Sequence, residues 1–218
     1  MREYHKIPTV FSRDPSTNYK TLILGKYATK ELEYLKDNIW CFSEKVDGIN
    51  IRVMFDPTLG ITFGGKTDRA QIPALLVNKL NEIFLPQIGI FEDNFEDGVC
   101  LYGEGYGAKI QKGGGNYNPT GVDFALFDIK IGDWWLQRKD VEDIAMKFGI
   151  EIVPIIGNGT LDRMIEIVKS EDAISSWATI DNPFRAEGIV ARPEVELKTR
   201  SGERIITKIK HKDFRERD

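Results

Sequence analysis

Histidine, cysteine and long apolar runs are all scarce in this sequence of 218 residues. The two histidines, His5 and His211, argue against a histidine-rich metal site and a Ser-His-Asp hydrolase, so we expect a lysine or a carboxylate to serve as base or nucleophile. The two cysteines, Cys41 and Cys100, indicate no disulfide framework and fit a reducing, cytoplasmic setting. No apolar run approaches the ~20 residues that a membrane helix needs, and the polar start is untypical of a secretory signal. We therefore expect a cytoplasmic protein with no membrane partner.

Positive charge is also in deficit, since the formal net charge is −4. This balance argues against indiscriminate binding of nucleic acid. Residues 198–217 are an exception, with eight Lys or Arg against three Asp or Glu. Such a basic strip attracts phosphates locally even in an acidic protein. A solvated strand and tail explains the strip equally well, and both interpretations stay open.

The remaining composition, 41% hydrophobic and 29% charged, is that of one globular domain. Short β-branched and aromatic segments between glycines and prolines predict strands, and apolar residues at helical spacing predict helices. The predicted strands are 51–56, 61–67, 99–107, 122–132, 151–156, 186–193 and 202–210. The predicted helices are 29–38, 74–84, 139–148 and 161–170. Strands outnumber helices and hairpins are plausible, so we expect the α+β class with antiparallel β-sheets flanked by helices.

The stretch GITFGGKT, residues 60–67, fits the phosphate-binding pattern G-x-x-x-x-G-K-[ST] at every specified position. A P-loop phosphotransferase using Lys66 is therefore one hypothesis. Such a loop must lie between a strand and a helix N-terminus. Here the variable positions favour an extended strand, and a helix starting at Lys66 would meet Pro73 within two turns. The pattern therefore disfavours the P-loop.

A second lysine lies in SEKVDGINIR, residues 43–52. Lys45 is preceded by Glu44 and followed by Asp47 and Gly48. A lysine flanked by carboxylates is typical of a surface ion pair, which contributes little. What favours a catalytic role is the series of segments that follows in order: GGKTDRAQIP, LYGEGYG, FALFDI, AEGIVAR and ITKIKHKDF.

This ordered series resembles the RNA ligase 2-like family of the covalent nucleotidyltransferase superfamily, which comprises polynucleotide ligases and capping enzymes. The resemblance covers residues 40–214. The K-x-D-G motif alone is weakly specific, whereas the whole series is strongly so. The resemblance implies that residues 1–218 form a single nucleotidyltransferase, or adenylation, domain.

The resemblance also implies roles for individual residues. Lys45 matches the nucleophile, Lys208 and Lys210 match two lysines that contact the α-phosphate, and Glu187 matches a carboxylate associated with the metal and the nucleotide. The residues implied to bind the nucleotide are Glu44, Asp47, Gly48, Asn50, Arg52, Lys66, Glu104, Phe127, Asp128, Glu187 and Arg192.

Two of these positions match specific nucleotide contacts, and two depart from the family pattern. Glu104 matches the glutamate that holds the ribose, and Phe127 matches the aromatic that stacks on adenine. Lys66 stands where the family usually has an arginine, and a lysine lacks the bidentate fork. Arg192 stands where a lysine is common.

The implied chemistry explains the abundance of lysine at the motif positions. Attack on the α-phosphate of ATP needs a neutral amine, whereas a free lysine has a pKa of ~10.4. Neighbouring cations can lower that pKa to ~7–8. Lys208 and Lys210, with Mg²⁺ (or Mn²⁺), are expected to supply this field near Lys45. The same cations would stabilise the charge on the phosphoryl oxygens.

The resemblance implies an ATP-dependent RNA ligase that joins RNA 3′-hydroxyl and 5′-phosphate ends through a lysyl-AMP intermediate. Such a reaction is typical of RNA repair. The sequence stops four residues after Phe214, too few for the OB-fold or helical domain that related ligases place there. The basic strip or a partner protein would then grip the RNA. Besides the P-loop enzyme, the alternatives are a non-catalytic RNA-binding remnant and a DNA-sealing ligase.

Overall fold

The computed structural model describes residues 3–170 and 173–214. The chain folds into two compact units. Among the described residues, unit 1 comprises 3–5 and 46–153, and unit 2 comprises 6–45 and 154–214. The boundary after Lys45 falls inside the KVDG motif, so its lysine belongs to unit 2 and its aspartate and glycine belong to unit 1.

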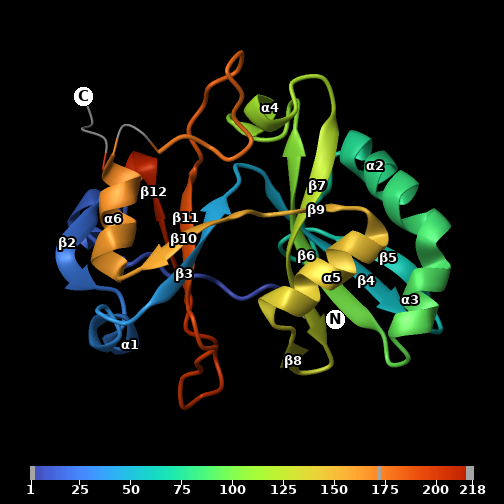
Figure 1. Ribbon diagram of the computed structural model, residues 1–218, viewed down its shortest axis with the longest axis horizontal. Helices are drawn as coiled ribbons and strands as arrows, with labels where there is room; N and C mark the ends of the chain where they lie inside the picture. The colour runs from blue at the N-terminus through green and yellow to red at the C-terminus, as the bar shows by residue number, and fades with distance from the viewer. Residues whose placement is uncertain (1–2, 171–172, 215–218) are drawn as a thin grey trace. The chain divides into compact units, whose positions relative to one another are not determined.

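Unit 1 is built on a six-stranded sheet with the order β5-β4-β6-β7-β8, in which β9 also pairs with β7 (Figure 1). Only the β7–β9 pair is parallel. The strands are β4 (Ile49–Asp56), β5 (Gly60–Gly64), β6 (Val99–Gly107), β7 (Val122–Ile131), β8 (Trp134–Trp135) and β9 (Glu151–Ile152).

The helices of unit 1 are α2 (Ala74–Phe84), α3 (Ile88–Asn94), α4 (Gly114–Tyr117) and α5 (Arg138–Phe148), and the 3₁₀ turn η2 (Leu85–Gln87) joins α2 to α3. Three of these helices, α2, α3 and α5, contribute buried apolar residues to the core of this unit. Leu76, Leu80 and Phe84 recur at helical spacing on α2 and are fully buried. Gly149 ends α5 in a left-handed conformation, with φ of 62°.

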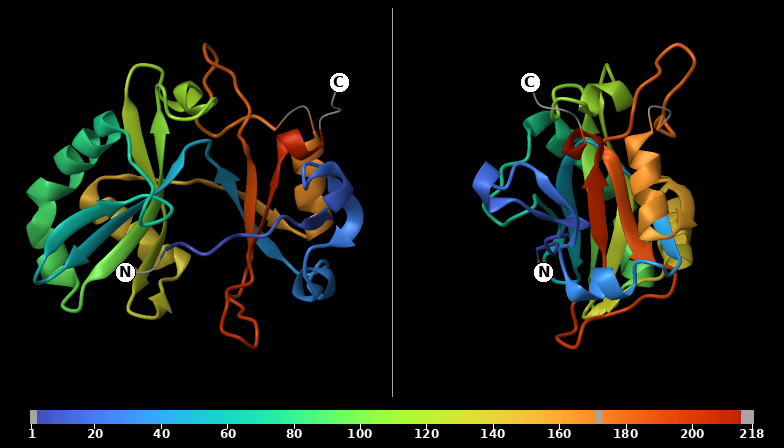
Figure 2. Two further views of the ribbon diagram at one scale, coloured as in Figure 1. Left: turned by 180° about the vertical axis from the view of Figure 1, so that it is seen from behind. Right: turned by 90° about the vertical axis from the view of Figure 1, so that its left-hand side faces the viewer.

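Unit 2 has a four-stranded antiparallel sheet with the order β10-β3-β11-β12 and a separate ribbon of β1 and β2. Figure 2 shows β11 and β12 running side by side. The strands are β1 (Phe11–Arg13), β2 (Leu22–Tyr27), β3 (Trp40–Lys45), β10 (Ile155–Gly159), β11 (Gly188–Pro193) and β12 (Thr207–Lys210). The helical segments are η1 (Pro15–Thr17), α1 (Lys30–Tyr34), α6 (Leu161–Lys169) and η3 (His211–Asp213).

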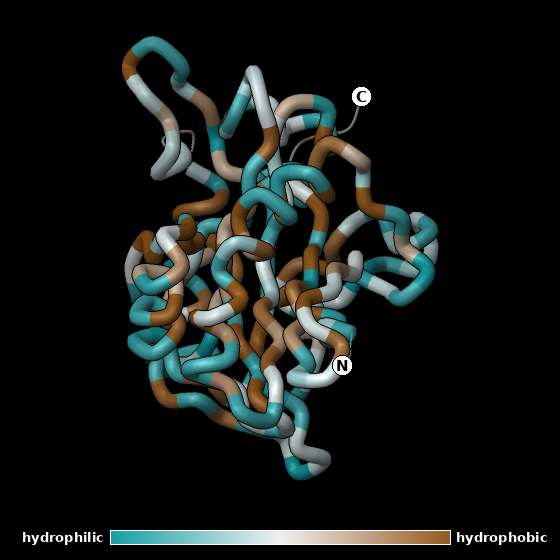
Figure 3. The backbone as a smooth tube through the Cα atoms, turned by 90° about the vertical axis from the view of Figure 1, so that its right-hand side faces the viewer, coloured by the Kyte–Doolittle hydropathy of each residue, from teal (hydrophilic) through white to brown (hydrophobic). Residues whose placement is uncertain are grey.

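One face of the unit 2 sheet is apolar and forms a core with α6. Trp40 and Phe42 on β3 and Ile209 on β12 are fully buried there with Leu161 and Met164 of α6. Colouring by hydropathy shows brown recurring along packed strands and helices and teal recurring in the loops (Figure 3). None of the helices in the described residues is long and apolar enough to cross a membrane.

The α+β class with antiparallel sheets is confirmed, whereas the P-loop is excluded by the local structure. Residues 60–64 form the edge strand β5, and no helix follows until Ala74, directly after Pro73. The predicted strand 151–156 is interrupted at Val153 and Pro154, so that β9 and β10 belong to different sheets. Proline lacks the N–H that a continuous strand would donate.

Candidate active site

In unit 2, Lys45 and Lys210 flank a glycine in the sheet. Gly188 pairs with Lys45 on one side and with Lys210 on the other. Residues opposite one another across neighbouring strands point their side chains to the same face, so the two lysines emerge together with no side chain between them. A Cβ on Gly188 would lie 2.1 Å from the carbonyl oxygen of Ile209, which explains why only glycine fits.

Glu187 joins these two lysines through one carboxylate. Lys45 Nζ donates to Oε2 and Lys210 Nζ donates to Oε1. The side chains are largely buried, with exposed fractions of 18% for Lys45, 13% for Glu187 and 20% for Lys210. Burial alone would raise the pKa of Glu187, but the charges of Lys45 and Lys210 outweigh it and hold the pKa below its usual value. This Lys45–Glu187–Lys210 cluster carries a net charge of +1 when all three groups are ionised.

Lys208 and Arg192 lie on the same face as this cluster. Lys208 is two residues before Lys210 on β12 and pairs with Val190. Its backbone N–H donates to the carbonyl oxygen of Pro8 at 3.1 Å, which ties β12 to the N-terminal segment. Arg192 is on β11 opposite Cys41 and is half-buried.

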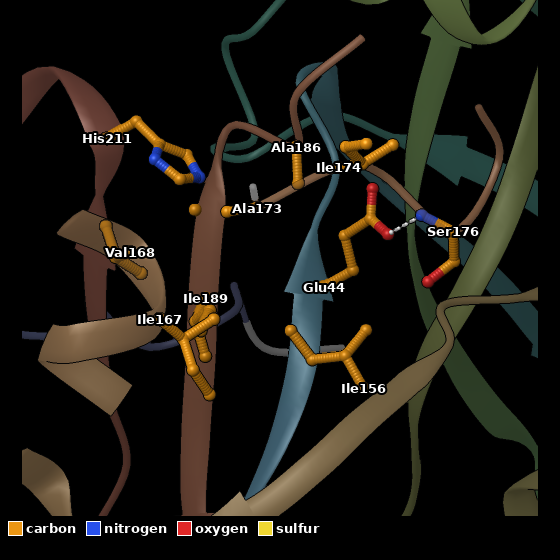
Figure 4. Close-up of a pocket in the computed structure, with 11 residues that line it drawn as sticks. Glu44, Ile156, Ile167, Val168, Ala173, Ile174, Ser176, Ala186, Ile189 and His211 are labelled. Atoms are coloured by element: carbon orange, nitrogen blue, oxygen red, sulfur yellow. Dashed lines mark hydrogen bonds between the residues drawn. The ribbon is translucent and has the colours of Figure 1, made fainter. Parts of the chain in front are cut away.

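Glu44 points to the opposite face of β3, into a pocket of about 320 Å³ (Figure 4). Its carboxylate accepts hydrogen bonds from Ser175 Oγ at 2.5 Å and from the Ser176 N–H at 2.8 Å. The side chain is 2% exposed. The structure therefore places Glu44 away from the lysine face, although it is the chain neighbour of Lys45. Nothing in the sequence around Ser175 and Ser176 indicated this contact.

In unit 1, Asp47 and Gly48 lie directly before β4 and make close contacts with neighbouring segments. Asp47 Oδ2 accepts from the Gly113 N–H at 2.9 Å and so fixes the glycine-dense segment that contains α4. A Cβ on Gly48 would lie 2.3 Å from the Gly105 carbonyl oxygen. The aspartate and glycine of the motif thus have clear structural roles here.

Asn50 and Glu104 are direct partners across β4 and β6. Asn50 Oδ1 is buried and accepts no hydrogen bond from the part of the chain that the structure describes. A buried acceptor of this kind is normally satisfied by protein or water. It therefore marks a place where a donor from a ligand or water is expected, next to the predicted ribose contact Glu104.

Phe127 lies at a β-bulge. Tyr102 pairs with Asp128 and Gly103 pairs with Leu126, so Phe127 is the extra residue on β7. The bulge leaves Phe127 half-buried, while Phe124 on the same strand is fully buried in the core. A bulge commonly re-aims a side chain near an active site.

Asp128 and Phe127 both contact Tyr4, a residue outside the motifs. The Tyr4 hydroxyl donates to Asp128 Oδ2 at 2.6 Å, and the Tyr4 ring meets the Phe127 ring edge-on at a centroid distance of 5.1 Å. Asp128 is 1% exposed. No local pattern in the sequence indicates that the N-terminal segment supports these two positions.

Lys66 and Arg52 lie on adjoining segments of unit 1. Lys66 is exposed in the loop after β5, whereas Arg52 on β4 is 1% exposed. The Arg52 guanidinium contacts the Gly65 carbonyl oxygen and the Asp68 carboxylate, so it lies beneath the loop that carries Lys66.

Glu187 is the carboxylate best suited to a metal on the lysine face. Mg²⁺ is often held by one or two carboxylates together with substrate phosphates. Within residues 3–170 and 173–214, no group of three or more His, Cys, Asp or Glu is arranged to hold a metal ion. The single carboxylate of Glu187 fits a metal whose other ligands are phosphate oxygens of a nucleotide and water.

The family model described as RNA ligase matches residues 38–210. The chain belongs to the RNA ligase family. The match covers most of the segment that carries the motif series, so the predicted resemblance is confirmed at this level. A comparison with curated proteins gives no match.

Solved structures of the RNA ligase from Naegleria gruberi are similar in fold. A variant with AMP and Mn has a TM-score of 0.63 and 17% identity, and the match covers 95% of this chain and 55% of that chain. The same ligase with PPi has a TM-score of 0.61 and 18% identity, and the match covers 96% of this chain and 62% of that chain. An apo variant has a TM-score of 0.61 and 17% identity, and the match covers 98% of this chain and 63% of that chain. This chain therefore spans between half and two thirds of the length of these relatives.

Proposed function

We propose that this protein is an ATP-dependent RNA ligase that joins RNA 3′-hydroxyl and 5′-phosphate ends through a lysyl-AMP intermediate on Lys45. Membership of the RNA ligase family supports the reaction class. The observation that carries the assignment is the Lys45–Glu187–Lys210 cluster, because it combines a candidate nucleophile, a second cation for phosphate and a carboxylate suited to a metal. The nucleotides and Mn named for the Naegleria structures support ATP and a divalent cation as ligands.

In the first step, the neutral amine of Lys45 attacks the α-phosphorus of ATP. A P–N bond forms, the bond to the bridging oxygen breaks, and pyrophosphate leaves with that electron pair. The Lys45 ammonium must first lose a proton to solvent, and the ion pair with Glu187 favours its charged form. We therefore propose that Glu187 releases Lys45 before attack, which leaves Lys210 as the nearby cation that lowers the pKa of the Lys45 amine.

Lys210, with Lys208, would also stabilise negative charge on the α-phosphate oxygens during attack. A bound Mg²⁺ or Mn²⁺, with Glu187 as a protein ligand, would supply further Lewis-acid stabilisation of the phosphoryl oxygens. Glu104 and Phe127 are proposed to hold the ribose and the adenine. For Glu44 and Arg52 the contacts within the protein favour structural support of the nucleotide-binding residues.

The later steps transfer AMP to RNA and then seal the strand. An oxygen of the RNA 5′-phosphate attacks the phosphorus of lysyl-AMP, the P–N bond breaks, and Lys45 regains a proton. The RNA 3′-hydroxyl then attacks the 5′-phosphorus of the adenylylated end, its proton passes to solvent, the phosphoanhydride bond breaks, and AMP leaves with that electron pair. Grip on the RNA is proposed to come from exposed cations of residues 198–214 or from a partner protein; Arg215 and Arg217 lie outside the described residues.

Incubation with radiolabelled ATP and Mg²⁺ tests the first step. We expect covalent labelling of the unmodified protein, loss of labelling in Lys45→Ala, and full labelling in Lys139→Ala, an exposed lysine on α5. Sealing of nicked duplexes then separates the alternatives. RNA sealing supports the proposal, preference for an all-DNA nick indicates a DNA ligase, and RNA binding without any adduct indicates a non-catalytic protein.

A further inference from the structure

Arg52 is an arginine that is buried within unit 1 and contacts the loop after β5. Its Nε donates to the Gly65 carbonyl oxygen at 2.9 Å, and its Nη2 pairs with Asp68 Oδ1 at 2.7 Å. Gly64 packs directly on the guanidinium, since a Cβ there would lie 2.9 Å from Nη2. One buried cation thus contacts three positions at the end of β5 and in the following loop.

A second set of contacts holds the same loop from other sides. The Asp68 N–H donates to Glu3 Oε1 at 2.9 Å, and the Ala70 N–H donates to the Thr67 carbonyl oxygen at 3.1 Å. A Cβ on Gly65 would lie 2.9 Å from the Ala70 Cβ, so the loop folds back closely on itself. Residues 64–70 therefore have a defined conformation without belonging to a helix or strand.

Lys66 and Arg69 are the cations that this loop displays. Both side chains are exposed, and among the described residues no ion pair engages either of them. Burying an arginine carries a desolvation cost, and its partner Asp68 is 78% exposed. Because a buried ion pair contributes little net stability, the main structural consequence of these contacts is the fixed position of the loop.

We propose that Arg52 is a positioning residue that fixes the 64–70 loop so that Lys66 and Arg69 engage a phosphate group of the substrate. Arginine suits this role because its planar fork reaches the Gly65 carbonyl and the Asp68 carboxylate at once, which a lysine cannot do. The phosphate belongs either to ATP or to the RNA end. Only the kinetic test of this inference rests on the proposed function; the structural test does not.

The kinetic test is a double-mutant cycle between Arg52→Met and Lys66→Ala. Misplacing a group that contacts the substrate lowers the reaction rate by about 10- to 100-fold. We therefore expect the affected step to be slower by this factor in Arg52→Met and in Arg52→Lys. In the Lys66→Ala background, Arg52→Met should cost much less, because the group that it positions is gone. Equal losses in both backgrounds would contradict the positioning role.

Two substrates distinguish the source of the phosphate. If the loop engages ATP, Arg52→Met slows formation of lysyl-AMP and leaves the sealing of pre-adenylylated RNA unchanged. If it engages the RNA end, sealing of pre-adenylylated RNA slows and the formation of lysyl-AMP does not. Normal rates with both substrates would contradict the proposal.

A structural test needs no catalysis, because trypsin cuts after Lys66 and Arg69. The folded loop should resist trypsin, and cleavage at these two sites should accelerate several-fold in Arg52→Met and in Asp68→Ala. Asp68→Ala removes an exposed side chain and leaves no internal cavity, so this variant is expected to fold. It is used for the test if Arg52→Met does not fold. Arg163→Met, which removes an exposed ion pair with Glu166, is the control and should not change cleavage there.

The two failures can be told apart. Unchanged cleavage of the loop in both variants would contradict the inference about Arg52. Absence of any lysyl-AMP in the unmodified protein would contradict the proposed function, whatever the cleavage pattern of the loop.

Discussion

At the scale of single residues, Lys45 has both a negative and a positive group close to it, the Glu187 carboxylate and the Lys210 ammonium. The sequence leads to the expectation that Lys208 and Lys210 lower the pKa of the Lys45 amine. In the structure Glu187 bridges Lys45 and Lys210, and its negative charge opposes that effect. Under the proposed mechanism, the reactivity of Lys45 would therefore depend on where the Glu187 carboxylate lies.

Replacing Glu187 with Gln should shift the pH dependence of lysyl-AMP formation to lower pH. Removing the negative charge favours the neutral amine, so the pKa of Lys45 falls. The maximal rate should also fall, because a candidate metal ligand is lost. Single-turnover rates measured across pH report both effects, and a profile that moves to higher pH would contradict the assigned role of Glu187.

The same carboxylate should contribute to stability in a pH-dependent way. Its pKa is lowered in the folded protein, so its contribution is present above the unfolded pKa of ~4.3 and is lost as pH falls through the folded value. We expect the free energy of unfolding of the unmodified protein to exceed that of Glu187→Gln at pH 7, with the difference shrinking in strong acid. Urea unfolding at several pH values measures this difference. Glu142→Gln, which breaks an exposed ion pair with Arg138, should show a much smaller pH-dependent change.

At the scale of secondary structure elements, glycines set how closely the strands and loops approach. Gly48→Ala places a Cβ 2.3 Å from the Gly105 carbonyl oxygen on β6. We expect it to lower the free energy of unfolding by about 1–3 kcal/mol, the usual cost of overpacking.

Gly89→Ala is a matched control for this substitution. Gly89 lies in α3 with no atom within 4 Å of an added Cβ, so alanine should be neutral or stabilising by about 0.5–1 kcal/mol. Thermal or urea unfolding compares the two variants. Equal stability of Gly48→Ala and Gly89→Ala would contradict the close packing of β4 on β6.

Sequence periodicity predicted α2, α5, α6 and the long strands β4, β6 and β7, but it missed β2 and α3, extended the last strand over 202–210 instead of 207–210, and did not predict the strand pairing. Helix α2 has the predicted bounds, since Leu76, Leu80 and Phe84 repeat at helical spacing after Pro73. The bulge at Phe127 and the contact between Arg52 and Asp68 depend on strand register and long-range packing, which local pattern does not encode. Motif order predicted the Lys45 and Lys210 positions, while Tyr4 and Ser175 have no local signal.

At the scale of the whole molecule, the residues assigned to different parts of the nucleotide fall in different compact units. Those assigned to the phosphates, Lys45, Lys208 and Lys210, belong to unit 2. Those assigned to the ribose and base, Glu104 and Phe127, belong to unit 1. The chain passes from unit 2 to unit 1 directly after Lys45, so the motif K-x-D-G is divided between them.

Under the proposed function, the acidic net charge implies that RNA binding would depend on a small number of local cations. Lys212 is exposed in η3, next to Lys210 and outside the residues assigned to catalysis. We expect Lys212→Ala to weaken RNA binding and to reduce the slope of log affinity against log salt by about 0.7, the value for one contact with single-stranded nucleic acid. Salt titrations of binding measure this slope. With Lys139→Ala as the control, an unchanged slope for Lys212→Ala would exclude Lys212 from the RNA surface.

The most direct measurement is the position of the covalent adduct. The protein is incubated with ATP and Mg²⁺, digested, and sequenced by tandem mass spectrometry. We predict one AMP attached through phosphorus to Nζ of Lys45, removed by pyrophosphate with the return of ATP. An adduct on another residue such as Lys66, or none at all in the folded protein, would contradict the assignment of Lys45 as the nucleophile.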